Sequence, residues 1–391
     1  MPKYLAHLNN KAITTMKVLI IGSQAKSLIN FRGPLIEEIV RKNHQVIAMA
    51  PIDEDYQRVS LWLSERGVEL KPYFIQRNGL SIFGDLRTYF DLKKQFNEIS
   101  PDKVLSYFIK PNIWGGLAFR KNRTSSFYSL IEGLGIIFNE NNKERKTLPA
   151  IRKLIISQLY KISMKKAKKV IFLNSDDINE FVSQQLLPIE KVEHINGIGL
   201  DLDYFSYQPM PLGELKFIMI GRLLKSKGFF EYIEAAKVVK KLYPEIIFNI
   251  LGPKDTSPDA IPISEIEKHH NSGLINYLGE TNDVRPHIAN SHIFVLPSYY
   301  GEGLPRTIME AMSIGRPILT TQNVGCRETV ENGKNGFLVP KYDVNSLAER
   351  MIWFIENNHL IENMGLHSRK MAVEKYDVNK INKEIMDIME L

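Results

Sequence analysis

Short apolar runs alternate with longer amphipathic stretches along most of the chain. In the first half, the runs that predict strands are Lys17–Ile21, Gln45–Met49, Lys103–Leu105, Phe127–Leu130 and Val170–Leu173. In the second half they are Phe217–Ile220, Ile247–Leu251, Ile275–Leu278, Ile293–Leu296 and Pro317–Thr320. Short apolar strands separated by helices are typical of parallel sheets that helices cover on both faces. We therefore expect an α/β fold.

The alternation is interrupted by a turn-rich segment between Asn196 and Pro211. A chain of 391 residues normally forms two domains. We therefore predict two Rossmann-like, doubly wound domains over residues 16–205 and 206–377, with ligands between the carboxyl ends of their strands. Met16 directly precedes the first predicted strand, so residues 1–15 are expected to be an N-terminal extension.

The composition is that of an ordinary protein of the cell interior. The single cysteine, Cys326, excludes an intramolecular disulfide and favours a reducing compartment. Residues 1–15 lack the apolar core of a secretory signal. No segment approaches the roughly 18 apolar residues of a membrane span. We therefore expect a cytoplasmic protein.

Positive charge is concentrated in the first half of the chain. Residues 1–205 hold 30 lysines and arginines against 21 acidic residues, a net charge of +9, whereas the remainder has a net charge of −2. Much of the excess lies in a predicted basic helix at about residues 146–169. Its apolar residues recur at helical spacing, and its basic residues follow the other faces. The apolar positions are Ile151, Leu154, Ile155, Leu159 and Ile162.

Two interpretations of this helix stay open. A basic amphipathic helix suits an anionic membrane surface, where each nearby cation contributes about 1 kcal/mol. The alternative is a helix that packs into the core of the first domain and leaves its basic face in solvent. Binding of nucleic acid is not expected, because no nucleic-acid-binding module accompanies the charge.

The most informative motif is the segment from Gly301 to Met312, which follows the predicted strand Ile293–Leu296. The order is strand, glycine-rich turn and helix, with Glu302 on the turn and Glu310 two turns into the helix. Glycines allow a ligand to approach the backbone, and a helix N-terminus favours an anion. Carboxylates accept several hydrogen bonds from sugar hydroxyls. The motif therefore predicts a site for a phosphorylated, hydroxyl-rich ligand.

A second motif, Ile218–Gly228, places cations after another predicted strand. Gly221 ends the strand, and Arg222 and Lys227 precede a helix that is expected to begin near Phe229. The guanidinium pairs with phosphate through two hydrogen bonds and the ammonium acts as a point charge. Both are suited to stabilise a departing diphosphate.

These motifs resemble those of the retaining glycosyltransferases of family 4, which have the GT-B fold. The two glutamates have the E-x7-E spacing of that family, and Gly221, Arg222, Lys227 and Gly228 match its donor-phosphate motif. Further matching segments are Leu296–Ser298, Gly315–Pro317, Glu328–Val330 and Asn335–Pro340. The resemblance implies two Rossmann-like domains facing each other across a cleft. It also implies that residues 378–391 form a helix that crosses back to the first domain.

The resemblance also implies roles for individual residues. Glu302 would hold the donor sugar and act in catalysis with Arg222 and Lys227, whereas Glu310 would hold the nucleotide ribose. The other donor-binding residues would be Gly221, Gly303, Leu304, Pro305 and Arg306. The donor is expected to be a UDP-linked N-acetylhexosamine, a substrate rather than a cofactor. No metal is expected: Asp201 and Asp203 form a D-x-D pattern, but they lie in the predicted linker, where a turn is the better interpretation.

The acceptor side is predicted in the first domain, from three segments. The loop Gly22–Gly33 contributes Asn30 and Arg32, and leads into a helix near Pro34. Lys110 follows the strand at Lys103–Leu105, and Glu132 begins the segment Glu132–Gly135.

These segments lack the paired glycines and the histidine of many family members, and resemble bacterial transferases that extend polyprenyl-diphosphate-linked sugars. We therefore expect a lipid-linked saccharide acceptor, and peripheral attachment to the inner face of the plasma membrane. Because the same fold also serves sugar-nucleotide epimerases and phosphorylases, these activities stay open as alternatives, as does an inactive lipid-bound scaffold.

Overall fold

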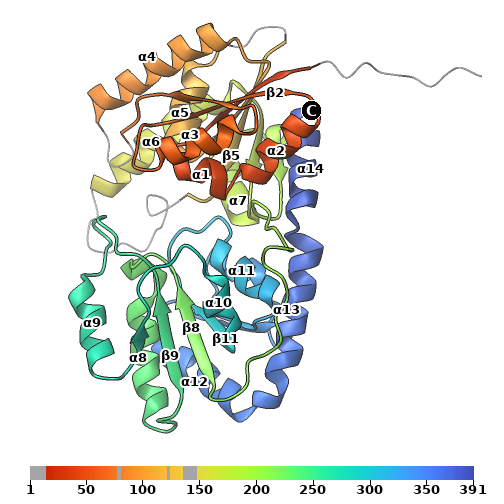
Figure 1. Cartoon of the computed structure of the whole chain (residues 1–391). Coiled ribbons are helices and arrows are strands. Elements are labelled where there is room, and N and C mark those ends of the chain that lie inside the picture. Colours follow the sequence, from red (N-terminus) through yellow and green to blue (C-terminus); the bar gives the residue numbers. More distant parts are fainter. Residues whose placement is uncertain (1–14, 77–80, 121–123, 135–147) are drawn as a thin grey trace, which may run out of the picture.

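The computed structural model contains two parallel β-sheets with their helices, one above the other in Figure 1. It describes residues 15–76, 81–120, 124–134 and 148–391, and the side chains of residues 148–153 are not described. The predicted extension 1–15 therefore lies almost entirely outside the described residues. The α/β prediction is confirmed, since every strand pair within the two sheets is parallel.

The first sheet has seven strands in the order β3-β2-β1-β4-β5-β6-β7. Their bounds are β1 Lys17–Ile21, β2 Gln45–Ala50, β3 Glu69–Pro72, β4 Lys103–Tyr107, β5 Ser126–Ile131, β6 Ala167–Phe172 and β7 Val192–His194. The strand order reverses beside β1, so the segments after β1 and β4 diverge there. A ligand crevice is expected at this switch point, outside the carboxyl ends of the strands.

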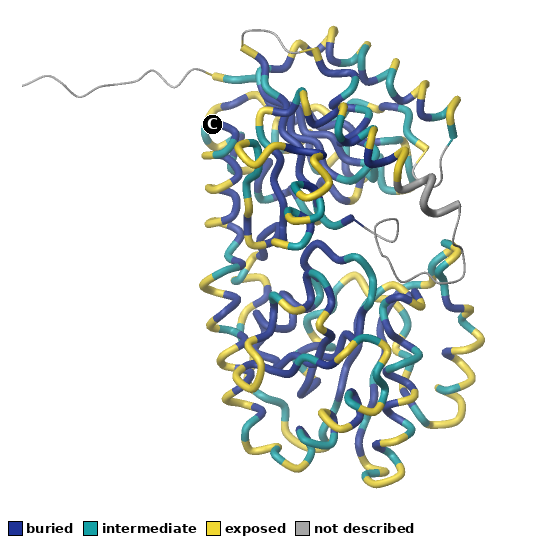
Figure 2. The backbone as a smooth tube through the Cα atoms, turned by 180° about the vertical axis from the view of Figure 1, so that it is seen from behind, coloured by how far each residue is buried: buried dark blue, intermediate teal, exposed yellow. Residues whose placement is uncertain are grey.

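Helices cover both faces of this sheet, because side chains of a strand alternate between its faces. In β1, Val18 and Ile20 join the core beneath one group of helices, α1 Ala25–Asn30, α2 Gly33–Arg41 and α3 Tyr56–Ser64. Leu19 and Ile21 join a separate core on the other face. That core lies beneath α4 Ile82–Ile99, α5 Ile109–Ala118, α6 Leu148–Met164 and α7 Ser175–Ser183. The buried strands thus sit between two helical layers (Figure 2).

The second sheet has six strands in the order β10-β9-β8-β11-β12-β13. The strands are β8 Lys216–Ile220, β9 Ile247–Leu251, β10 Asn276–Tyr277, β11 Ile293–Leu296, β12 Ile318–Thr321 and β13 Gly336–Val339. The helices are α8 Phe229–Lys240, α9 Ile263–Asn271, α10 Arg285–Ala289, α11 Arg306–Ile314, α12 Val344–Glu356 and α13 Ile361–Lys375. Three short 3₁₀ turns accompany them in the described part of the chain, η3 Lys225–Lys227, η4 Arg327–Thr329 and η5 Asn358–Leu360, and another, η2 Ile189–Lys191, precedes β7 of the first sheet. The switch point of this sheet lies between β8 and β11.

The last helix, α14 Val378–Met389, returns to the first domain (Figure 1). It packs against α2, and the Tyr128 hydroxyl donates to the carbonyl of Met389 over 3.2 Å. Lys103 pairs with Glu390 at 3.2 Å, immediately after the helix. The chain therefore crosses between the sheets twice, once after β7 and once before α14. The residue limits at 205 and 377 stay predictions.

The predicted strands are all present; the ends of some match the prediction, and those of the others are shifted by at most three residues. The prediction for Gly22–Gly33 is wrong in part: this segment is not a loop throughout, because residues Ala25–Asn30 form α1. Three strands were not predicted, β3, β7 and β13. Among the described residues, no helix has both the length and the apolar character needed to cross a membrane.

Two of the recognised sequence motifs prove to be structural. Arg316 of the Gly315–Pro317 segment is fully buried, and its guanidinium donates to the carbonyls of Gln208, Pro209, Ile288 and Ala289. It therefore fastens the interdomain linker to α10. The D-x-D pattern is a turn, as predicted, since Asp201 Oδ1 accepts from the backbone of Asp203 at 3.0 Å.

Candidate active site

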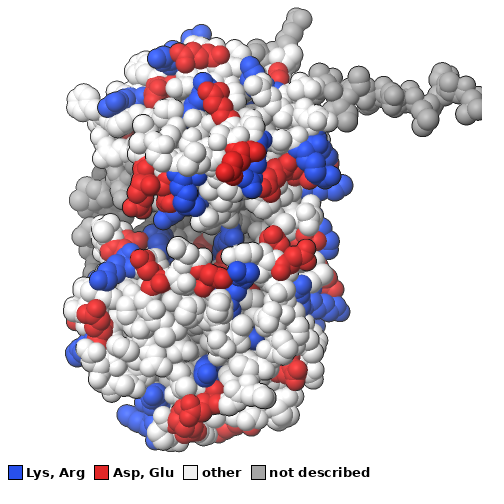
Figure 3. Space-filling view, viewed as in Figure 1, with Lys and Arg blue, Asp and Glu red and all other residues white. Residues whose placement is uncertain are grey.

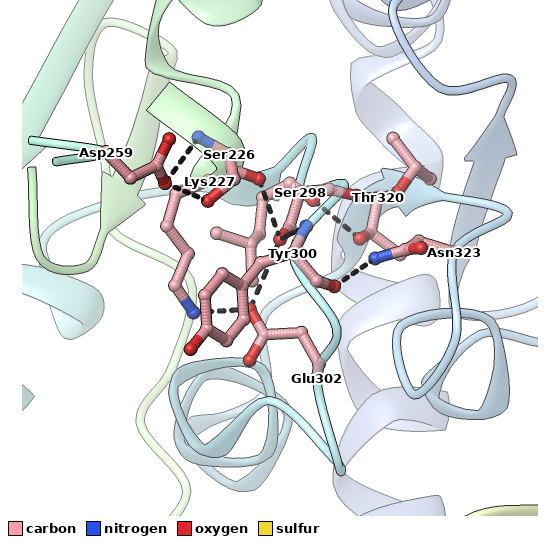
Figure 4. Close-up of polar contacts among 10 residues, drawn as sticks. Ser226, Lys227, Asp259, Ser298, Tyr300, Glu302, Thr320 and Asn323 are labelled. Carbon is pink, nitrogen blue, oxygen red and sulfur yellow. Dashed lines mark hydrogen bonds and ion pairs between the residues drawn. The ribbon is translucent and has the colours of Figure 1, made fainter. Parts of the chain in front are cut away.

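The loop between β11 and α11 carries Glu302 at the carboxyl edge of the second sheet (Figure 4). Its carboxylate is almost buried, and Oε1 accepts from Lys227 Nζ and from Ser298 Oγ, the latter at 3.2 Å. Ser298 also accepts from the backbone N–H of Tyr300 at 3.2 Å. These hydrogen bonds within the second domain fix the conformation of the loop, so the position of Glu302 is set by the protein itself.

Lys227 reaches this carboxylate from the turn between β8 and α8. The turn ends at Gly228, whose φ of 87° is left-handed, and a Cβ there would lie 2.2 Å from the carbonyl oxygen of Pro297. Only glycine fits this position. The close approach brings the ends of β8 and β11 together, so the two sequence motifs form one site. Lys227 Nζ also lies 5.2 Å from the centre of the Tyr300 ring, a cation–π contact.

Arg222 lies at the same edge and is half exposed. Its Nη1 pairs with Asp255 Oδ2 at 2.8 Å. Asp255 also accepts from the backbone N–H of Ser257 at 2.7 Å, and its pKa is lowered because these hydrogen bonds and the charge of Arg222 outweigh its partial burial. The Asp255 carboxylate is therefore charged near neutral pH, and it orients the guanidinium of Arg222. The sequence analysis did not identify Asp255.

Glu310 occupies the second turn of α11, as predicted. It is buried, which raises its pKa, and the neighbouring Arg306 opposes that shift through a 2.8 Å contact from Nε to Oε1. The same guanidinium donates through Nη1 to the carbonyl of Asn30 in the first domain. Arg306 therefore joins the two domains through its side chain, a role that the sequence analysis did not foresee.

The first domain contributes a buried ion pair between Arg32 and Glu132. The guanidinium is fully buried and lies 4.5 Å from the centre of the Tyr107 ring. Burial raises the pKa of Glu132, and the charge of Arg32 opposes that shift. The second carboxylate oxygen of Glu132, Oε2, is buried without a hydrogen-bond partner among the described residues. An unsatisfied buried acceptor atom of this kind is rare and marks Glu132 as a functional candidate.

Lys110, the remaining acceptor-side candidate, lies in the first turn of α5. Its Nζ pairs with Asp85 of α4 at 2.8 Å, and both side chains are mostly buried. Lys110 therefore already has a charged partner within its own domain. The structure does not bring it into contact with Arg32 or Glu132.

The two domains meet backbone to backbone beside these residues. A Cβ on Gly303 would lie 2.4 Å from the carbonyl oxygen of Glu132, and one on Gly133 would lie 2.5 Å from the backbone nitrogen of Gly303. Asn174, in the first domain, donates from Nδ2 to the carbonyl of Gly303 at 2.9 Å. The surface is hollowed between the domains, with charged side chains at the rim and within (Figure 3). Glu302 and Glu132 thus lie on opposite sides of one contact.

Asn174 and its neighbours were missed by the sequence analysis. Asn174 caps α7, since its Oδ1 accepts from the backbone N–H of Asp177 at 2.8 Å, and its Nδ2 donates to the Asp177 carboxylate at 2.9 Å. Asp176 pairs with Arg327 of the second domain, and the backbone N–H of Ser175 donates to Glu328 at 3.2 Å. An asparagine followed by two aspartates after an apolar strand is a helix-start signal. That signal predicts that Asn174 caps a helix, but it does not predict that Asn174 bonds to Gly303 of the second domain.

The predicted basic helix is α6, and it packs on the core of the first domain, as the packing interpretation expected. Its core-facing residues are Ile156, Tyr160 and Met164, with Leu159 of the predicted apolar face packed beside them, whereas Leu154, Ile155 and Ile162 of that face are exposed. The prediction that those three residues belong to the core-facing side is therefore wrong. Residues 146 and 147 and the side chains of Ile151, Arg152 and Lys153 lie outside the described part.

The cations from the last turn of α6 to the start of β6 differ in their contacts. Lys166 donates to the carbonyls of Leu117 and Phe119 and is structural. Lys168 pairs with Glu390 and Lys169 with Glu193. Lys161 and Lys165 have no ion-pair partner within the described residues.

Comparison with known families identifies the domain that carries Glu302, Glu310, Arg222 and Lys227. The model of the glycosyl transferases group 1 matches residues 204–371, which span nearly the whole second sheet and its helices. The second domain is a group 1 glycosyl transferase domain. The recognition made from the sequence motifs is therefore confirmed, and the chain is a glycosyltransferase.

Two curated relatives align with the glycosyltransferase over nearly its whole length. The N,N'-diacetylbacillosaminyl-diphospho-undecaprenol alpha-1,3-N-acetylgalactosaminyltransferase of Campylobacter jejuni is 27% identical over 95% of this chain and 98% of its own. The UDP-Gal:alpha-D-GlcNAc-diphosphoundecaprenol alpha-1,3-galactosyltransferase of Escherichia coli is 24% identical over 91% of this chain and 94% of its own.

Among solved structures, the glycosyltransferase resembles Anabaena HepE in complex with UDP. The TM-score is 0.74 at 18% identity, and the match covers 96% of this chain and 100% of HepE. Identity at this level supports the fold alone. The prediction of a GT-B arrangement of two Rossmann-like domains is confirmed.

We predict that the buried carboxyl of Asp177 makes the stability of the glycosyltransferase pH-dependent. Burial, with Asp176, Glu328 and Glu180 nearby, raises the pKa of Asp177 to about 7 from the ordinary 3.8. The folded state therefore binds this proton more tightly than the unfolded chain, so the free energy of unfolding should fall as the pH rises from about 4 to about 7. We expect Asp177→Asn to flatten this dependence and to raise stability above about pH 7.

Urea unfolding at several pH values across this range measures the effect. Asp387→Asn, on the exposed side of α14, is the matched control and should leave the slope unchanged. A wild-type slope in the Asp177→Asn variant would contradict the assignment.

Proposed function

We propose that the chain is a retaining glycosyltransferase that moves an N-acetylhexosamine from a UDP-sugar to a polyprenyl-diphosphate-linked saccharide. The observation that carries the proposal is the Lys227–Glu302 contact at the carboxyl edge of the second sheet. It places a diphosphate-binding cation beside a carboxylate suited to sugar hydroxyls. The first domain meets the same loop at Glu132 and Gly133. A donor and an acceptor would thus bind on opposite sides of one contact.

The donor would bind in the second domain. Arg222 and Lys227 would hold the diphosphate near Gly221 and the backbone of Gly303, Leu304 and Arg306, since Pro305 has no N–H. The Lys227 ammonium has three N–H donors, so its contact with Glu302 leaves donors for phosphate oxygens. Glu302 would accept from the sugar hydroxyls. Glu310, held by Arg306, would accept from the ribose.

The reaction that we propose needs no covalent enzyme intermediate. The bond between the anomeric carbon and the diphosphate oxygen breaks, giving an oxocarbenium-like transition state. The acceptor hydroxyl attacks the same face and forms the new glycosidic bond. Its proton passes to the departing diphosphate oxygen. Because negative charge grows on the diphosphate as the bond breaks, Arg222 and Lys227 stabilise the transition state more than the ground state. This arrangement supplies the charge that a metal supplies in other transferases.

The acceptor would lie against the first domain. The unpartnered oxygen of Glu132 would accept from a hydroxyl of the acceptor, while Arg32 holds the other oxygen. Asn30 and Lys110 would complete this side. The Campylobacter and Escherichia relatives are named for undecaprenyl-diphosphate-linked substrates, which favours a lipid-linked acceptor and sugar transfer over an epimerase, a phosphorylase or a scaffold.

A lipid-linked acceptor places the enzyme at the inner face of the plasma membrane. The basic end of α6 suits the anionic surface there, since Lys161 and Lys165 lie beside the exposed Ile162. Each cation near such a surface contributes about 1 kcal/mol of attraction. We propose that these two lysines draw the first domain to the membrane.

Loss of the Lys227 ammonium should slow the chemical step. We expect Lys227→Ala to lower kcat by roughly 100-fold or more, as for other lost contacts to a developing charge, and wild-type activity to survive EDTA. Initial rates of sugar transfer measure both effects. Lys225→Ala, two residues away and exposed, is the control and should behave as wild type. A strict manganese requirement together with a nearly active Lys227→Ala variant would overturn the proposed role.

The two glutamates should separate nucleotide binding from sugar transfer. We expect Glu310→Gln to weaken the binding of free UDP, because the ribose loses a charged acceptor. Glu302→Gln should bind UDP normally and transfer sugar poorly. Titration calorimetry with UDP, beside transfer assays, measures the split. If both variants lose UDP affinity equally, the proposed division of roles is wrong.

Charge reversal on α6 should release the protein from anionic lipid. We expect Lys161→Glu with Lys165→Glu to abolish sedimentation with anionic vesicles, because the local charge changes sign. Lys166 is left intact, since it bonds to backbone carbonyls. The matched control is Lys241→Glu with Lys268→Glu, two exposed positions on the second domain. Equal sedimentation of both double variants with the wild type would show that α6 is structural only.

A further inference from the structure

The helix α4 carries an apolar stripe that faces solvent. Phe83 is 88% exposed, Ile82 77% and Phe90 61%, and Leu86 is also exposed. Ile82, Leu86 and Phe90 recur at intervals of four residues, and Phe83 lies three residues before Leu86, so the four line one side of the helix. We call these four residues the α4 stripe. Side chains of this size normally leave water during folding.

The opposite side of α4 fixes the helix firmly to its domain. Leu92, Phe96 and Ile99 are buried in the core of the first domain. Ser81 caps the helix by accepting from the backbone N–H of Gly84 at 3.2 Å. Asp85 pairs with Lys110 of α5. The stripe is therefore a feature of a well-packed helix and not of a frayed one.

A second exposed apolar group lies on α6. Both α4 and α6 pack against α5, and Leu154, Ile155 and Ile162 of α6 are exposed. Together the two helices hold seven of the eighteen exposed large hydrophobic residues among the described part of the chain. Scattered single residues of this kind are normal, but a gathering on two helices that flank α5 marks an interaction site.

The position of these helices relates them to the proposed acceptor side. Helices that follow parallel strands begin at the carboxyl edge of the sheet, and α4, α5 and α6 follow β3, β4 and β5. The Asp85–Lys110 pair confirms that α4 and α5 begin at the same edge. Glu132 stands at that edge, directly after β5. Both views show α4 and α6 on the same side of the first domain (Figures 1 and 2).

Exposed cations lie beside the apolar groups. Arg87 is exposed on α4, and Lys165 is exposed directly after α6 ends at Met164. The acidic residues of α4 are turned inward or lie at its far end: Asp85 pairs with Lys110, Asp91 accepts from the backbone of Phe74, and Glu98 pairs with Lys94 in the last turns. Apolar side chains flanked by cations match an anionic lipid interface.

We propose that the α4 stripe inserts into the interface of the anionic bilayer that holds the acceptor, with Leu154 and Ile155 in the first half of α6 on the same side of the domain. The inference rests on the proposed lipid-linked acceptor. The diphosphate of such an acceptor lies at the membrane surface while its prenyl chain stays in the bilayer. Insertion at the carboxyl edge of the first sheet would bring that diphosphate to the side where Glu132 lies. The bilayer would then cover the apolar residues that the fold leaves in water.

The test separates insertion from folding and from chemistry. In Phe83→Ser with Phe90→Ser, we expect binding to vesicles of phosphatidylglycerol and phosphatidylethanolamine to fall at least about 10-fold, because apolar area drives interfacial binding. Transfer to a long-chain acceptor in vesicles should fall with it, and transfer to a short water-soluble acceptor should stay at the wild-type rate. The control is Leu242→Ser with Leu366→Ser, two exposed leucines of the second domain, which should change neither reading.

Direct contact is measured with a single reporter. The emission of a Phe83→Trp variant should be quenched by lipids brominated on their acyl chains, and that of Leu242→Trp should not. Unchanged vesicle binding of the Phe83→Ser, Phe90→Ser variant, or an unquenched Phe83→Trp variant, would overturn the inference. So would loss of a dimer by that double variant in ultracentrifugation, since the stripe would then pack on a second copy. Failure of the wild type to glycosylate any lipid-linked acceptor would instead overturn the proposed function, and the quenching would still report on insertion.

Discussion

The candidate site depends on one steric constraint, the contact between the backbone at Gly303 and the backbone at Glu132 and Gly133. A side chain on either glycine would collide with peptide atoms of the other domain. Backbone atoms have no rotamers with which to move aside, so in this arrangement of the domains the loop that carries Glu302 can lie against the first domain only with glycine at both positions. Asn174 bonds the same loop from a third direction. The geometry of the whole cleft follows from this contact.

The charged residues of the cleft are arranged as neutralised pairs. Lys227 contacts Glu302, Arg222 contacts Asp255, Arg306 contacts Glu310 and Arg32 contacts Glu132. A buried charge without a partner is costly, so such pairing lets several ionised groups stand together in a partly dry crevice. It also sets the direction of each side chain. An incoming polyanion would meet cations that are already oriented, which reduces the ordering that binding requires.

The sequence allowed most of the fold and the location of the site to be predicted, for identifiable reasons. A buried parallel strand such as β11 is a continuous apolar run, and its limits were predicted correctly. The strand β3 was missed because Glu69–Pro72 is polar and lies at a sheet edge, where burial imposes no pattern. The motif around Glu302 was recognisable because strand, turn and helix are contiguous. The partners Asp255 and Asn174 were not, since they come from distant segments and only the folded chain brings them close.

The same limit applies to the apolar face of α6. Helical spacing identified an amphipathic helix, yet two apolar sides were available, and the spacing did not say which one would meet the core. Tyr160 and Met164 fill the space beneath α6, and Leu154 and Ile155 are left outside. Arg316 is the opposite case, because its segment was recognised from the sequence but its role was not. Its side chain holds the interdomain linker.

The return of α14 to the first domain has a mechanical consequence. The two chain crossings lie side by side, because Leu200 and the segment Tyr376–Val378 exchange backbone hydrogen bonds of 2.7 and 3.0 Å. A single covalent connection would allow one domain to swivel in any direction. Two adjacent connections form a hinge, which allows rotation about one axis at that side of the molecule. The domains can then separate only by rotation about this hinge. The cleft opens on the side away from the hinge, and on closing the two domains return to the same relative position.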